Sequence, residues 1–400
     1  MILLGDWAPG SLHCDVSWPA GCALLNLEGP LLPAGHQLPP APKAGPHLHT
    51  VAPPPPARPL VCALANNHIM DFGPAGLAET LSALLAAGIH AVGAGDTLDV
   101  ARQPLFLDDA GTRVAILACC EAQFGVAVAA QPGVAAFGPW VYAAIRACAA
   151  QADAVIVSVH AGAEVSPWPA PAIQDLYRSW IDAGAAVVHG HHPHVPQGLE
   201  EYHDGLIFYG LGNLAVNPHE WQAYPNALWS LGVDIQLGRR PLQWRALEIN
   251  LTASGERLAI TARESAEHAA YLADCNRPLV DRKLLTALWQ DVADRAYREY
   301  YRGYLGLPPE RASGKPTAAP VTSLWRQMWC GARPSPRASR QDYLLWHHLF
   351  GCLTHRDLIA TALGVLGGEL PDLRSDASRR LVDQWLPWTQ PFATAAGAPS

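Results

Sequence analysis

Short apolar runs alternate with helical patterns along the N-terminal part of this 400-residue chain. Each run is bounded by Gly, Pro or polar residues, which is typical of strands covered on both faces of a sheet. The predicted strands are Ile2–Leu4, Ala23–Leu25, Leu60–Leu64, Val114–Ala118, Ala154–Val159, Ala185–Val188 and Leu206–Tyr209. Further strands, open to an antiparallel arrangement, are expected at Val233–Leu237, Leu247–Leu251 and Leu258–Thr261.

Helices are expected between these strands. One runs from Pro74 to Gly88 and another from Pro171 to Gly184, because a proline opens each, apolar residues follow at helical spacing and a glycine ends it. The repeated order of strand and then helix predicts a layered α/β domain.

After Glu264 the alternation of short apolar runs and helices gives way to helical patterns alone. Helical patterns cover Tyr271–Tyr304, Tyr343–Leu366 and Ala377–Trp385, and a segment rich in Pro, Ser and Arg, Pro308–Arg340, separates the first two. We therefore divide the chain into an α/β domain over residues 1–263 and a helical C-terminal region over residues 264–400.

A proline-rich stretch, Pro39–Pro59, interrupts the α/β pattern. Proline cannot support a helix interior or a central strand, so this stretch is predicted to be a long loop. It could be a surface insertion or one wall of a substrate groove. Trp168 is the tryptophan that we expect to line such a groove.

Composition and charge narrow the classes of function. The formal net charge is −8 and no run of Lys or Arg stands out, which disfavours nucleic-acid binding. The N-terminus resembles a core strand and not a signal peptide, and no apolar window has the length of a membrane helix. We expect a cytoplasmic protein without membrane insertion, whose nine scattered cysteines are reduced core residues. The oligomeric state does not follow from the sequence.

Carboxylate, imidazole and amide side chains follow several of the predicted strands. In an α/β sheet the carboxyl ends of the strands are where ligands bind, since the loops there converge. The segments are Gly5-Asp6, Asn26-Leu27-Glu28, Ala65-Asn66-Asn67-His68 with Asp71 and Gly73 after it, His160-Ala161-Gly162-Ala163-Glu164, His189–His194 and, more weakly, Gly210–Asn213. Carboxylates, imidazoles and an amide oxygen are the ligands that Zn²⁺, Mn²⁺ or Fe²⁺ take, so the set predicts a divalent-metal site with one or two ions.

The densest of these segments is Gly190-His191-His192-Pro193-His194. Three imidazoles directly after a buried strand would be costly unless they had polar partners or a metal. This cluster is therefore the strongest single indication of metal binding.

Taken in order, the motifs resemble those of the CapA (poly-γ-glutamate and capsule synthesis) family, within the calcineurin-like metallophosphoesterase superfamily. The motifs are Gly-Asp, Asn-Leu-Glu, Asn-Asn-His-x-x-Asp-x-Gly, His-x-Gly-x-Glu, Gly-x-His-Pro-His and Gly-Asn, over roughly Met1–Asn217. The resemblance implies a four-layer α/β/β/α sandwich with the metal centre at its strand ends, and says nothing of the chain after Glu264.

The resemblance also implies roles for individual residues. Asp6 would bind one metal, Glu28 would be the bridging carboxylate, and Asn67 and His160 would bind the second metal. His192 and His194 would bind one metal each. His68 would be the general acid, and Glu164 and His191 would lie beside the ligands or contact substrate.

One departure from the superfamily pattern lies in the first motif. The usual Asp-x-His is here Asp6-Trp7-Ala8, so a ligand histidine is missing, and Glu28 is longer than the usual aspartate. The first metal is therefore expected to be weakly held or absent.

Three functions agree with this site. The first is metal-dependent hydrolysis of a phosphoester or amide bond in capsule or surface-polymer biosynthesis. The second is epimerisation at a peptide Cα in ribosomal (lasso-type) peptide biosynthesis, with Asp6 and a histidine moving the proton. The third is non-catalytic binding of a polymer. The partner is accordingly an anionic polymer or a peptide, and we take the hydrolase as the leading hypothesis.

Overall fold

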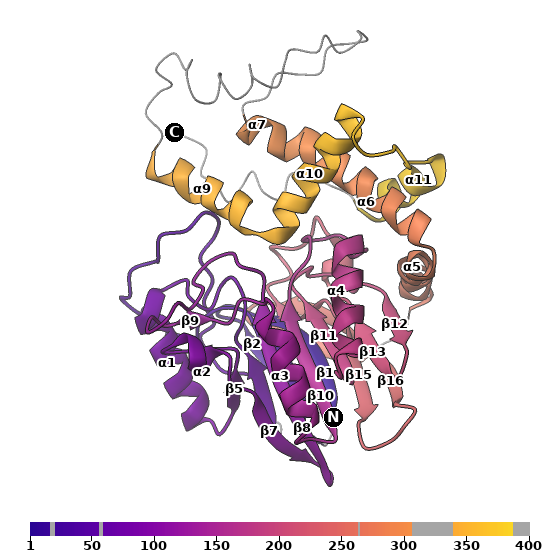
Figure 1. Ribbon diagram of the computed structural model, residues 1–400. Helices are drawn as coiled ribbons and strands as arrows, with labels where there is room; N and C mark the ends of the chain where they lie inside the picture. The colour runs from indigo at the N-terminus through magenta and orange to yellow at the C-terminus, as the bar shows by residue number, and fades with distance from the viewer. Residues whose placement is uncertain (17–20, 56–58, 263–264, 306–338, 387–400) are drawn as a thin grey trace.

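The computed structural model confirms a mixed α/β architecture followed by a helical C-terminal region (Figure 1). It describes residues 1–16, 21–55, 59–262, 265–305 and 339–386. The predicted strands and the two helices predicted between them are present, whereas most of the Pro/Ser/Arg-rich segment lies outside the described residues.

The first sheet contains the N-terminal strand at its centre. Its order is β2-β17-β16-β15-β1-β3-β4-β5, with β14 also paired to β1. The strands are β1 (Ile2–Ala8), β2 (His13–Asp15), β3 (Ala23–Leu27), β4 (Leu60–Ala63), β5 (His90–Val92), β14 (Asn213–Val216), β15 (Trp229–Gln236), β16 (Gln243–Ser254) and β17 (Arg257–Ala262). β1 runs parallel to β3, while β15, β16 and β17 form the expected antiparallel meander.

The second sheet has the order β12-β13-β11-β10-β8-β7. Its strands are β7 (Leu105–Asp109), β8 (Thr112–Cys120), β10 (Ala154–His160), β11 (Val187–His191), β12 (Leu199–Tyr202) and β13 (Gly205–Phe208). The four central strands are parallel and the two edge strands are antiparallel to them. A short separate ladder joins β6 (Ala94–Gly95) and β9 (Gly133–Val134).

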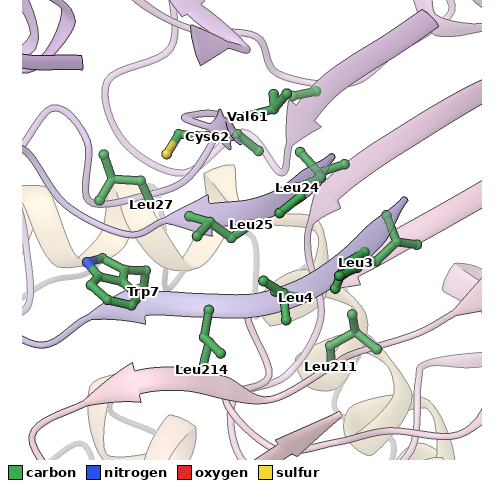
Figure 2. Close-up of a cluster of buried hydrophobic side chains, with 14 of the residues drawn as sticks. Leu3, Leu4, Trp7, Leu24, Leu25, Leu27, Val61, Cys62, Leu211 and Leu214 are labelled. Atoms are coloured by element: carbon green, nitrogen blue, oxygen red, sulfur yellow. The ribbon is translucent and has the colours of Figure 1, made fainter. Parts of the chain in front are cut away.

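One hydrophobic core joins the two sheets. Leucines of β1 and β3 pack together with Val61 and Cys62 of β4, with Leu214 of β14 and with Leu211 just before it (Figure 2). Alternate residues of the second sheet, such as Ile116 and Ile156, belong to the same core, so this sheet turns one face toward the first.

Two helices, α3 (Trp140–Ala149) and α4 (Pro171–Asp182), cover the other face of the second sheet. The α/β part also contains α1 (Gly73–Ala86), α2 (Leu98–Ala101) and the 3₁₀ turn η1 (Pro225–Ala227). Residues of α3 and α4 share a second core with Val155 and Val157 of β10. The complete four-layer order expected from the sequence stays a prediction.

The C-terminal helices lie across one end of the sheets (Figure 1). They are α5 (Ala266–Asn276), η2 (Arg277–Val280), α6 (Arg282–Ala296), the π-helical turn η3 (Tyr297–Tyr301), α7 (Arg302–Tyr304), α9 (Arg340–Gly351), α10 (Leu353–Gly367) and α11 (Asp376–Trp385). The single helical stretch expected at Tyr343–Leu366 is instead two helices bent by 80°, because Cys352 adopts an extended backbone between them.

Two findings concern the environment of the chain. Among the described helices, none is by itself long and apolar enough to cross a bilayer; only the bent pair α9–α10 meets the criteria of length and composition when both are counted together. The cysteines at described positions are all free, as expected from their scattered spacing.

Candidate metal centre

The alternation of side chains along β10 and β11 places histidines at one end of the inter-sheet core. Ala154 and Ile156 of β10 face that core, so Ser158 and His160 follow on the same face. His189 and His191 follow Val187 in the same way on β11. These side chains therefore point toward β1, which carries Asp6.

Seven residues from both sheets approach one another closely enough to bind a metal. They form four overlapping groups of three, in each of which the ligand atoms lie within 4.8 Å of one another. The groups are Asp6–His160–His191, Glu28–His160–His192, Glu164–His192–His194 and Asp6–Glu28–His194. We call these seven residues the candidate metal centre; the overlap of the groups is compatible with one ion or two.

The distances at the heart of the centre are short. Glu28 Oε1 lies 3.6 Å from His160 Nε2 and 3.6 Å from His194 Nε2. Asp6 Oδ2 lies 3.7 Å from His194 Nδ1. Asn67 Oδ1 lies 2.8 Å from His160 Nε2, so the amide predicted to be a ligand reaches the same place.

One carboxylate of this centre, Glu28, is buried without the partners that a buried charge needs. Both oxygens of Glu28 have no hydrogen-bond partner among the described residues, and Glu28 is fully buried. Burial, with the neighbouring charge of Glu164, raises the pKa of Glu28 well above its usual value. Burial and Glu28 raise the pKa of Asp6 to about 7. A divalent cation would supply the missing counter-charge, so the residues present fit a metal.

Three histidines of the centre, His160, His191 and His192, are held in the neutral form. Burial first, and then the surrounding imidazoles, lower the pKa values of His160, His191 and His192 well below the usual value. Neutral imidazole is the form that binds metals, because the coordinating nitrogen must carry a free lone pair. His192 Nδ1 is a further buried atom with no partner among the described residues.

Hydrogen bonds fix the orientation of His194. Asn213 Nδ2 donates to the Ala227 carbonyl at 3.0 Å, which turns Asn213 Oδ1 toward His194 Nδ1, also at 3.0 Å. His194 Nδ1–H therefore donates to Asn213, and His194 Nε2 is left with its lone pair facing Glu28.

Asparagines hold the strand ends in place. Asn26 Nδ2 donates to Asp6 Oδ1 at 2.8 Å, and Asn66 Nδ2 donates to Asn26 Oδ1 at 3.0 Å. Asn66 Oδ1 in turn accepts from the backbone N–H groups of His68 and Ile69, which shapes the turn after β4. Sequence reasoning placed these two asparagines in the motifs but gave them no role.

The backbone around the histidine cluster is unusual. His192 and His194 adopt φ values of +102° and +62°, a region that non-glycine residues rarely occupy. A Cβ at Gly190 would lie 2.2 Å from the Tyr209 carbonyl oxygen, so only glycine fits where β11 passes the chain after β13. This close approach helps to hold the strained loop in place.

A second group of polar side chains lies beside the centre. His68 Nδ1 contacts Asp71 Oδ2 at 2.8 Å and Lys43 Nζ at 2.9 Å, and Lys43 also pairs with Asp71. Burial and the Lys43 ammonium lower the pKa of His68 to about 4, against the opposing effect of Asp71. Lys43 belongs to the proline-rich loop, so part of this loop is buried against the site and is not merely a surface insertion.

The helical region also reaches the centre. Gln123 Nε2 lies 3.3 Å from His192 Nε2 and 3.5 Å from the Sγ atom of Cys352, the residue between α9 and α10. The ring of His348 stacks on Phe124, with 4.8 Å between the centroids. No sequence pattern indicates the contacts to Cys352 and His348, because they join residues more than 200 positions apart.

Trp168 is not the groove residue that we expected. It is 1% exposed within the core of the outer helices, and its indole N–H donates to the Asp274 carbonyl at 3.1 Å. Trp221 lies against the site instead, with its ring centroid 4.6 Å from that of His194.

Together these features define an α/β protein with a buried centre of carboxylates and imidazoles that could bind a divalent metal. Residues 19–218, half of the chain, match the family described as bacterial capsule synthesis protein PGA_cap, and the chain belongs to this family. The family lies in the metallophosphoesterase-like superfamily, as the motifs predicted.

Curated relatives carry names from the same area of biology. The chain is 37% identical over 160 residues to the capsule biosynthesis protein CapA of Bacillus anthracis, which covers 38% of this chain and 39% of that protein. It is 36% identical over 171 residues to a probable polyglutamine synthesis accessory protein of Mycobacterium tuberculosis, covering 39% and 45%. It is 36% identical over 154 residues to the PGA biosynthesis protein CapA of Bacillus subtilis, covering 37% and 40%. The matches thus span less than half of these relatives.

Among solved structures, a hypothetical protein from Thermus thermophilus aligns with 66% of this chain and 97% of its own. The TM-score is 0.31 and the identity 14%, which is too low to define a shared fold.

Proposed function

We propose that this protein is a metal-dependent hydrolase that cleaves a phosphoester or amide bond in an anionic surface polymer or its precursor. The observation that carries the proposal is the convergence of Asp6, Glu28, His160, His192 and His194, with both Glu28 oxygens buried and unpartnered among the described residues. Within this proposal the two sheets and their helices form the four-layer sandwich of the superfamily.

Each residue has a part in the proposed reaction. Asp6, Glu28, Asn67, His160, His192 and His194 would hold the metal, and Glu164 lies within reach of the same ions. When bound, a divalent metal polarises a substrate oxygen and lowers the pKa of bound water. The surrounding apolar core keeps bulk water away from these groups.

His68 is assigned to proton movement at the scissile bond. Its Nδ1 faces Asp71 Oδ2 and Lys43 Nζ, so Nε2 is the ring nitrogen left for proton transfer. Lys43 and Asp71 hold the ring in place from the side of the proline-rich loop. His194 lies near enough to the ring to contribute to the lowered pKa of His68.

The experiment begins with metal-free protein that is reloaded with Mn²⁺, Fe²⁺ or Zn²⁺ and analysed for bound metal. The loaded protein is then incubated with poly-γ-glutamate and, separately, with bis-p-nitrophenyl phosphate. We expect product release that requires metal and falls at least about 100-fold in His68→Ala, as general acid–base groups contribute roughly 10²–10⁴-fold. His192→Ala should also lose bound metal.

The outcomes separate the candidate functions. Wild type that binds as little metal as His192→Ala would refute the metal centre. Metal binding without release of product would refute hydrolysis of these probes. Deuterium uptake from D₂O into a peptide, without a further change of mass, would instead support epimerisation.

A further inference from the structure

A chain of buried hydrogen bonds runs from the backbone of β1 to His160. His189 Nε2 lies 2.8 Å from the Leu4 carbonyl oxygen, and His189 Nδ1 lies 3.1 Å from Ser158 Oγ. Ser158 Oγ lies 3.0 Å from His191 Nε2, and His191 Nδ1 lies 2.9 Å from His160 Nδ1. All four side chains are at most 1% exposed, so water cannot replace any of these partners.

The direction of every bond in this chain follows from its first member. A carbonyl oxygen only accepts, so His189 Nε2–H donates to Leu4 and His189 Nδ1 carries a lone pair. The Ser158 hydroxyl then donates to His189, and its oxygen accepts from His191 Nε2–H. His191 Nδ1 is thereby left as an acceptor, because a neutral imidazole carries one proton.

The last bond decides the state of His160. His191 Nδ1 can only accept, so His160 Nδ1–H donates to it. The lone pair of His160 is then on Nε2, which lies 2.8 Å from Asn67 Oδ1 and 3.6 Å from Glu28 Oε1. These three atoms are all acceptors, and such a set is held together by a cation.

We propose that His189, Ser158 and His191 are positioning residues that fix His160 with Nε2 toward the metal. His191 therefore acts through His160. Ser158 and His189 connect His191 to the backbone of β1 and so fix its orientation. The inference rests on the proposed function, since it concerns the same metal.

One further contact has to agree with this assignment. Asn26 Nδ2 lies 3.3 Å from His160 Nδ1. If it donated there, two lone pairs would face each other between His160 and His191 at 2.9 Å. Asn26 Nδ2 has a better acceptor in Asp6 Oδ1 at 2.8 Å, so the chain from Leu4 sets the proton.

The test is Ser158→Ala, which removes the one hydroxyl that links His189 to His191. Its matched control is Ser230→Ala, a fully buried serine of β15 whose hydroxyl has no partner among the described residues. We expect Ser158→Ala to weaken Mn²⁺ or Zn²⁺ binding by about 10–100-fold, the usual effect of losing a group that orients a ligand histidine. Ser230→Ala should bind as wild type. Thermal unfolding of each metal-free variant shows whether it folds.

A second pair of variants tests the role of His191. His191→Asn puts an amide oxygen near the place of Nδ1, where it accepts from His160, and His191→Leu offers no acceptor. We expect the Asn variant to bind metal at least about 10-fold more tightly than the Leu variant, within the range that such orienting groups contribute.

Equal metal affinity of Ser158→Ala and Ser230→Ala, or of the two His191 variants, would overturn the positioning role. Failure of the wild type itself to bind metal would instead refute the proposed function. The two failures are therefore distinguishable in one titration series.

Discussion

At the scale of single residues, the main feature is the pair of buried carboxylates, Asp6 and Glu28. Burial raises the pKa values of both, Asp6 to about 7, and the negative charge of a neighbouring carboxylate adds to the effect. The strain at His192 and His194 and the unpartnered Glu28 oxygens lie at the same place. Backbone strain and unpartnered buried groups, which lower stability, are concentrated at sites where proteins bind ligands.

The pKa of Asp6 predicts how metal affinity depends on pH. Below about pH 7 the Asp6 carboxyl carries a proton, which a metal has to displace, whereas the centre's histidines with lowered pKa values are already neutral. Affinity for Mn²⁺ should therefore fall as pH decreases from about 7.5 to about 5.5, by up to about tenfold per unit for each proton displaced. Calorimetric titration at several pH values measures this fall.

Asp6→Asn is the comparison for that prediction. It should bind metal more weakly and with a flatter dependence on pH, since one of the displaced protons is gone. A wild-type affinity that stays constant over this range would contradict the raised pKa of Asp6.

At the scale of elements, one carboxylate attaches the helical region to the α/β part. Glu121 follows β8 and accepts from Gly162 N at 3.0 Å, from Thr354 N at 2.9 Å and from the Cys352 thiol at 2.9 Å; the Thr354 hydroxyl also donates to it. It thus binds the start of α10 and the loop that carries Glu164. The bend between α9 and α10 occurs at this attachment.

Glu121→Ala should reduce the free energy of unfolding by about 3 kcal/mol, because it leaves several buried donors without an acceptor. Urea denaturation followed by circular dichroism measures the change. The exposed Glu299→Ala is the control and should change the value by less than about 0.5 kcal/mol. Equal effects of the two substitutions would show that Glu121 does not hold the helices.

At the scale of the whole molecule, the candidate metal centre lies where the two sheets and the C-terminal helices meet. The ligands proposed above come from β1, from β10 and from the loops after β3, β4 and β11, so a bound metal would join segments far apart in the chain. Binding energy at such a place adds directly to the stability of the folded state.

Metal loading should accordingly stabilise the protein. At a free Mn²⁺ concentration about 100 times Kd, the free energy of unfolding should rise by about 2.7 kcal/mol relative to protein in EDTA. His192→Ala, unfolded in parallel at the same metal concentration, should gain less. No difference between metal and EDTA for the wild type would argue against a site that forms only in the folded chain.

The sequence by itself determined the strand ends and their chemistry. Alternating buried strands and helices indicate the layers, and polar residues at the ends of apolar runs give the segments of the site. The resemblance to the CapA family then singled out Asp6, Glu28, Asn67, His160, His192 and His194 within those segments. These features are local, because the period of a strand and the composition of its end are set by neighbouring residues.

Only the tertiary structure decided which partners these residues have. Lys43 beside His68, Gln123 beside His192, and the chain from Leu4 to His160 join positions that no periodicity connects. The burial that raises the pKa of Asp6 and makes each hydrogen bond in that chain obligatory exists only after two sheets and a helical layer pack together. The sequence thus identifies the carboxylates and imidazoles of the site, whereas tertiary packing determines where their protons and lone pairs lie.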